Sequence, residues 1–141
     1  MSIAGVKTYA RARMRSLGYT EWMDGFNFAN IPSTLLNSRF HVALGDSIGI
    51  SNNQDNQTIE SEFTIRIFRQ GTADPKTSID TATTSADTVI TDLLRASNRL
   101  TQTEIKNVRF NSMAIEPIDV SNDNGLIVRM SFTALVIIST R

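Results

Sequence analysis

The sequence predicts an α+β fold, with a mainly antiparallel four-stranded sheet built from two hairpins and two helices packed on one face. Three observations predict it. In four stretches apolar residues alternate with polar ones, as on a strand with one buried face. In two others apolar residues recur every three or four positions, as on a helix. The resulting order of helix, strand, strand, helix, strand, strand favours two hairpins joined by a helix.

The two helices are predicted over residues 2 to 17 and 79 to 97. Ser2 and Ser78 can cap their N-termini, and Gly18 ends the first helix. The predicted strands lie in four stretches, which are "SRFHVALG", "SEFTIRIFRQ", "KNVRFNSMAIEPID" and "GLIVRMSFTALVIIST". We expect the first two to form one hairpin and the last two another, with Asn124 and Gly125 in its turn.

The segment between the first two strands, about residues 45 to 61, is polar and is predicted to be a long flexible loop within a single domain spanning residues 1 to 141. A loop this long in a compact domain is either functional or disordered. We expect it to dock a partner protein. The candidate docking residues are Asp46, Asn52, Asn53, Asp55 and Gln57.

The last strand has two unequal rows of side chains. One row is apolar throughout and includes Val128, Phe132 and Val136, so the helices should cover it. The other row begins with polar residues and becomes apolar only at its end. It belongs to a sheet face mixing arginine with aromatic and aliphatic residues, which is typical of a protein interface. The predicted subunit interface consists of Arg66, Phe68, Arg129, Leu135 and Ile137.

Composition narrows the function classes. The 14 basic and 14 acidic residues cancel, which argues against nucleic-acid binding by bulk charge, and without cysteine no thiol chemistry is expected. No signal-peptide pattern opens the chain, and the apolar run at its end is shorter than the roughly 20 residues of a membrane span. We therefore expect a cytoplasmic protein with no membrane contact.

We predict no enzymatic activity, metal or cofactor. His41 could act as a general base, but no nucleophile motif accompanies it. The segment "DVSNDNG" resembles a calcium loop, although its glycine is one place late and Met130 stands where the closing glutamate should be. A basic stripe of Lys7, Arg11 and Arg15 on the first helix could contact DNA phosphate or an acidic partner, or could simply be the solvated face of the helix.

The arrangement of segments resembles the tail terminator proteins of long-tailed bacteriophages, also called tail-to-head joining or minor tail proteins. The likeness is carried by the N-terminal amphipathic helix, the strand after "NIPSTLLNSRF", the partner strand "SEFTIRIFRQG", the helix "DTVITDLLRAS" and the long final strand. It covers nearly the whole chain as a pattern of elements.

This resemblance implies a homo-oligomeric ring, typically a hexamer, that caps the tail tube, stops its polymerisation and joins it to the head connector. Its partners would be copies of itself, the tail tube protein and the connector or neck protein, while DNA passes through without specific binding. The protein would reside in the virion, and in the host cytoplasm during assembly. Alternatives are a head completion or neck protein, a host-derived binding module, or a small nucleic-acid-binding module using the basic helix.

Overall fold

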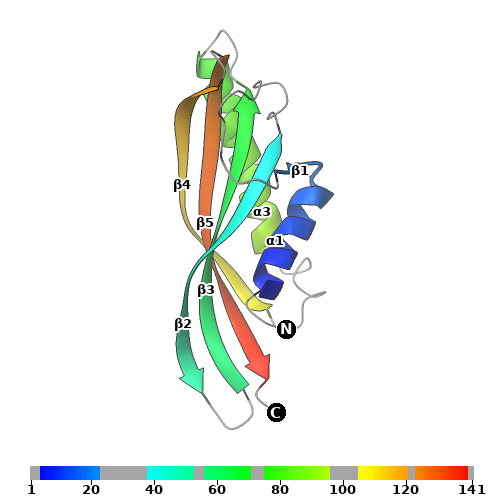
Figure 1. The fold of residues 1–141 in the computed structure, drawn as a ribbon, viewed down its shortest axis with the longest axis vertical. Coiled ribbons are helices and arrows are strands. Elements are labelled where there is room, and N and C mark those ends of the chain that lie inside the picture. The colour runs from blue at the N-terminus through cyan, green and yellow to red at the C-terminus, as the bar shows by residue number, and fades with distance from the viewer. Residues whose placement is uncertain are drawn as a thin grey trace.

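A computed structural model describes residues 4–22, 38–52, 56–70, 75–95, 105–120 and 123–139 of the 141 residues. The fold is α+β (Figure 1), as the sequence predicts. In chain order the elements are α1 (Ala4–Ser16), β1 (Thr20–Glu21), β2 (Arg39–Asn52), β3 (Asn56–Gln70), α3 (Pro75–Leu94), β4 (Ile105–Val120) and β5 (Asp123–Ser139).

The sheet has five strands in the order β1-β2-β3-β5-β4, and it is mixed because β1 runs parallel to β2. The predicted four-stranded antiparallel sheet made of two hairpins is therefore wrong. The missed strand has only two residues, Thr20 and Glu21, which is too short to show alternation. It forms because Gly18, at φ 94°, ends α1 and turns the chain towards Arg39 and Phe40.

The predicted loop over residues 45 to 61 is replaced by paired strands. β2 continues to Asn52, β3 begins at Asn56, and the two pair as far as Asn52 and Gln57. The reason is tertiary, because β5 pairs with the other side of β3 along this whole segment. Polar residues therefore form strands where backbone partners are supplied on both sides. Asn53 and Asp55 lie outside the described residues.

We call this end of the sheet the arm: Ile48–Asn52 of β2, Asn56–Glu60 of β3 and Leu135–Ser139 of β5. In Figure 1 it extends below the helices, near the C-terminus. The rest of the sheet, together with α1 and α3, is called the body.

Two further boundaries differ from those predicted. The second helix begins at Pro75, not at Ile79, because proline is well tolerated in the first turn of a helix. Ser78 is accordingly inside the helix and buried. At the β4–β5 connection Asn124 pairs with Asp119, so Asn124 and Gly125 belong to β5 and not to the turn.

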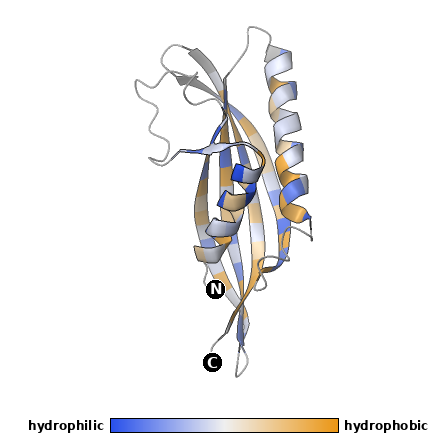
Figure 2. Cartoon of the chain, turned by 90° about the vertical axis from the view of Figure 1, so that its right-hand side faces the viewer, coloured by the Kyte–Doolittle hydropathy of each residue, from blue (hydrophilic) through white to orange (hydrophobic). Residues whose placement is uncertain are grey.

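Both helices pack on the same face of the sheet (Figure 2). The predicted burial of one row of β5 beneath them is confirmed, and each of its large apolar side chains stabilises the fold by about 1.5–3 kcal/mol. The fully buried residues of this row are Val128, Met130, Phe132, Ala134 and Val136. They pack against Phe63, Ile65 and Ile67 of β3 and against apolar residues of both helices, among them Val6, Ala10 and Met14 of α1 and Ala86, Val89 and Leu93 of α3.

Candidate interaction surfaces

The two helices are joined by a bidentate ion pair. Arg13 Nε and Nη2 donate to the two carboxylate oxygens of Asp92, each at 2.8 Å. Asp92 is only 8% exposed, and its hydrogen bond is the main cause that raises the pKa of Arg13. The Tyr9 hydroxyl also donates to the Leu93 carbonyl at 3.1 Å. The charge-assisted Arg13–Asp92 pair and the Tyr9 hydrogen bond together hold α1 against α3.

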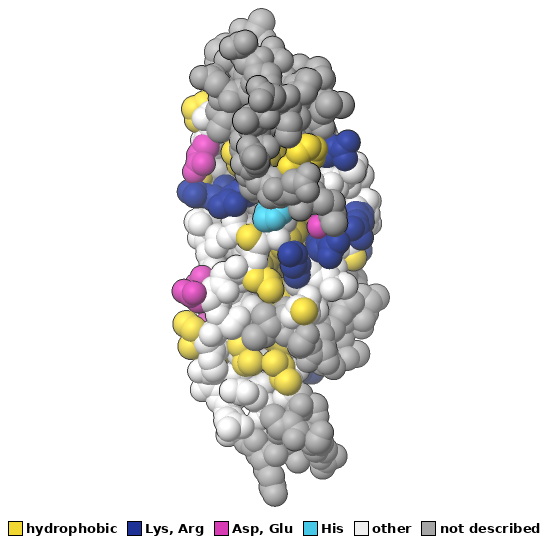
Figure 3. Space-filling model, viewed as in Figure 1, with side chains coloured by type: hydrophobic (Ala, Val, Ile, Leu, Met, Phe, Trp, Pro, Cys, Tyr) yellow, Lys and Arg dark blue, Asp and Glu magenta, His cyan; other side chains and the backbone are white. Residues whose placement is uncertain are grey.

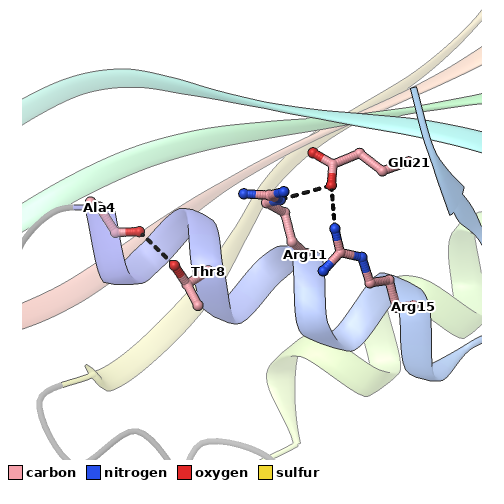
Figure 4. A network of polar contacts seen from close by, with 5 residues as sticks. All are labelled: Ala4, Thr8, Arg11, Arg15 and Glu21. Atoms are coloured by element: carbon pink, nitrogen blue, oxygen red, sulfur yellow. Dashed lines mark hydrogen bonds and ion pairs between the residues drawn. The ribbon is translucent and has the colours of Figure 1, made fainter. Parts of the chain in front are cut away.

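The predicted basic stripe is partly neutralised within the chain. Arg11 Nε and Arg15 Nη2 both contact Glu21 Oε2, at 2.8 and 2.7 Å (Figure 4). Glu21 belongs to β1, the two-residue strand that the alternation pattern does not predict. Lys7, the third member, is half-buried. The stripe therefore presents less positive charge to a partner than the sequence alone indicates.

His41 lies on β2 directly opposite Arg66 of β3. Burial lowers its pKa, and the positive charges of Lys7 and Arg66 lower it further, against a smaller opposing effect of Glu21. The imidazole is therefore neutral at pH 7. Among the described residues, positive charges predominate around the imidazole, and they disfavour its protonated form. This arrangement does not form a recognisable catalytic pair.

The sheet face opposite the helices, here called the open face, is mainly polar. Arg66 and Arg129 are cross-strand neighbours on it. Arg129 Nη2 lies 3.0 Å from Glu116 Oε1, and Arg109 Nη1 lies 3.5 Å from Glu60 Oε1. These exposed ion pairs add little stability, but they make the open face a surface of balanced charge.

The apolar members of the predicted interface are less exposed than expected. Phe68 is 2% exposed and lies opposite Ile127, which is 8% exposed. Phe68 therefore offers almost no area to a second subunit. Leu135 and Ile137 do lie on the open face, in the arm, and both are half-buried. The predicted interface thus consists of two arginines and two partly covered aliphatic residues.

Exposed apolar side chains gather instead on the two edge strands. Within the described ranges, five of the six large apolar residues that are exposed lie there: Leu44, Ile48 and Ile50 on β2, and Phe110 and Met113 on β4; the sixth, Ile79, is on α3. Figure 3 shows basic side chains across the middle of one view of the molecule and apolar ones below them. Exposed apolar strand edges are sites where another strand can pair.

Both edges are long. In the part of the chain that the structure describes, β4 has no strand on its outer side, and β1 pairs with only Arg39 and Phe40 of β2. The sequence carried one signal for these edges, since "SIGISN" (47–52) and "FNSMAI" (110–115) lack charge and proline. That signal could not be recognised without knowing which strands are outermost.

The predicted docking residues lie at or near the arm. Asp46 is exposed at an irregularity between Leu44 and Ser47, just before the arm begins. Asn52 and Gln57 face each other as the last described pair of β2 and β3. Together they make a polar end to the sheet, beside the exposed Ile48 and Ile50.

One open hollow of about 430 Å³ lies between α3 and Arg69 of β3. Arg69 already donates to Ser85, Ser38 and Tyr19 there. Thr84 and Thr88, which also line it, donate to helix carbonyls. We assign no chemistry to this hollow, because its polar side chains mainly form hydrogen bonds that stabilise the fold.

No group of three or more possible metal ligands occurs among the described residues. None of the described helices is long and apolar enough to span a membrane. No protein-family model matches the chain, and no curated protein matches it significantly.

Proposed function

We propose that this chain is a structural protein of a long-tailed bacteriophage virion, a tail terminator whose copies form a ring that caps the tail tube. The observation that carries the proposal is the concentration of exposed apolar side chains on the two edge strands, together with a projecting arm. Such surfaces suit contacts between proteins better than the binding of a small molecule. The resemblance in the order of elements supplies the specific role.

In this proposal the body forms the ring and the end of the arm meets a partner. Asp46, Asn52 and Gln57 would contact the tail tube or the head connector, since the arm is the part that extends beyond the helices. DNA would pass through the ring without specific binding. The single carboxylate of Glu21 offsets one of the two charges of Arg11 and Arg15, which makes the basic helix a weaker candidate for a DNA contact, so we do not propose the nucleic-acid-binding alternative.

The proposal is tested by adding the purified protein to the polymerising tail tube protein of the same phage. We expect tubes to stop growing at lengths set by the protein-to-tube ratio, with a ring at one end of each tube in electron micrographs. The matched control is a variant in which Asn52 and Gln57 are both changed to lysine, which should assemble but cap poorly.

Two results would overturn it. Binding to the head connector with undiminished tube growth would assign the chain to the neck instead. A monomer that shifts DNA in a gel, with strong dependence on salt, would favour the basic-helix alternative.

A further inference from the structure

One row of side chains crosses the whole antiparallel part of the sheet. Leu44 of β2 pairs with Phe63 of β3, Phe63 with Phe132 of β5, and Phe132 with Phe110 of β4. All four side chains lie on the face that the helices cover. We call Leu44, Phe63, Phe132 and Phe110 the cross-sheet row.

The row is well packed in the middle and open at both ends. The rings of Phe63 and Phe132 are stacked with centroids 5.2 Å apart, and Phe110 meets Phe132 edge-on at 5.8 Å. Phe63 and Phe132 are fully buried, whereas Leu44 and Phe110 are each 39% exposed. Each end of the row therefore keeps apolar area that the chain itself does not cover, and the two ends lie on opposite edges of the sheet.

The strand directions suit a repeat of the same unit. β2 is antiparallel to β3, β3 to β5 and β5 to β4, so three reversals leave β2 and β4 antiparallel to each other. A second copy rotated about an axis along the strands keeps its strand directions. Its β4 would therefore run antiparallel to β2 of the first copy, which continues the pattern already present inside the sheet.

The charges beside the row are also complementary. Asp46 follows Leu44 by two residues, and Arg109 precedes Phe110 by one. In an antiparallel junction both would lie on the same side of the row. The Arg109 side chain is 58% exposed, so it can reach a carboxylate on a neighbouring copy.

From these observations we infer that copies of this chain join edge to edge, β2 of one against β4 of the next, so that Leu44 of one copy contacts Phe110 of its neighbour. The contact is heterologous, and repeating it closes a ring when the rotation permits. The inference rests on the proposed function for the existence of a ring. It goes further by naming the two surfaces that join the copies in that ring. It moves the subunit contact from Arg66, Leu135 and Ile137 on the open face to the strand edges.

Disulfide cross-linking can test this contact without interference, because the chain contains no cysteine of its own. The double variant Leu44→Cys/Phe110→Cys places one thiol on each edge. Three strand spacings separate these positions within a chain, roughly 14 Å, which exceeds the reach of about 7 Å between the Cα atoms of a disulfide. Any bond must therefore join two copies. Under mild oxidation we expect a ladder of covalent dimers, trimers and larger species on a denaturing gel.

The controls separate this contact from others. Leu44→Cys alone and Phe110→Cys alone can give no species beyond a dimer, and mixing the two single variants should give a covalent 1:1 dimer. Ile79→Cys/Phe110→Cys uses the exposed apolar residue on α3 in place of Leu44 and should give no ladder.

Three outcomes would overturn the inference. Efficient self-linking of Phe110→Cys alone would show β4 pairing with β4. An oligomeric wild-type protein that yields no ladder from the Leu44→Cys/Phe110→Cys variant would place the contact elsewhere and leave the proposed function standing. A wild-type protein that stays monomeric with capped tubes absent would reject both. A ladder without any effect on tube growth would instead reject the tail terminator role alone.

Discussion

The two ends of β2 differ sharply in burial although they share one strand and one partner. Phe40 and Val42, near its start, are 0% and 1% exposed, whereas Ile48 and Ile50, in the arm, are 59% and 51% exposed. Both ends pair with β3. Phe40 and Val42 lie opposite Ile67 and Ile65 on the face that the helices cover, whereas Ile48, after the irregularity between Leu44 and Ser47, lies opposite Glu60 on the open face. The arm also extends beyond the helices in Figure 1. Strand formation and burial are thus separate outcomes, because a paired strand is buried only where other side chains cover its face.

The largest expected effect comes from truncating a side chain at each end of β2. Phe40→Ala should lower the free energy of unfolding by about 3–5 kcal/mol, because it opens a cavity under the helices. Ile48→Ala should change it by no more than about 0.5 kcal/mol in the dissociated chain, as is usual for surface positions. Urea unfolding over a dilution series separates this value from any contribution of assembly. Equal losses for the two variants would contradict the comparison.

A smaller effect is expected when the helical cover is loosened. Arg13→Met should destabilise the body by about 3 kcal/mol, because it leaves the carboxylate of Asp92 buried without its partner. The matched control Arg11→Met should cost less than about 1 kcal/mol, since Arg15 still contacts Glu21. Thermal unfolding followed by circular dichroism measures both. If Arg13→Met/Asp92→Leu fails to recover most of the loss, the ion pair is not the cause.

The smallest effect concerns His41, on the buried half of β2. Its pKa is lowered from 6.5 in the folded chain, mainly by burial and then by Lys7 and Arg66, so the unfolded chain binds the proton more tightly. The contribution of neutral His41 to stability is complete above pH 6.5 and is lost as pH falls below that value. His41→Gln should flatten this decline as the pH falls below 6.5. An unchanged decline would mean that other groups cause it.

Several elements could be predicted from local sequence, for a clear physical reason. The spacing of Val6, Ala10 and Met14 marks a helix, and the alternation around Phe132 marks a strand, because side-chain direction repeats with the backbone geometry. The end of α1 at Gly18 was also predictable, since a left-handed φ of 94° favours glycine. These features depend on a few consecutive residues.

The candidate surfaces were less predictable. Alternation in β2 and β4 indicates strands but does not show that β3 and β5 pair with each other, which leaves β4 at one edge and most of β2, beyond its two-residue pairing with β1, at the other. The mixture of arginine and apolar residues on one sheet face predicted an interface that includes Phe68, yet Phe68 is buried in the single chain. A polar stretch predicted as a loop became the arm because β5 supplies partners from the far end of the sequence.

By itself, the amino-acid sequence determined which stretches are helical, which strands carry an apolar row, and that the fold is α+β, because periodicity is a property of neighbouring residues. Only the tertiary structure decided the order of the strands, the parallel addition of β1 and the position of the exposed edges. Those features arise from backbone hydrogen bonds between segments distant in sequence, and every backbone offers the same donors and acceptors whatever its side chains.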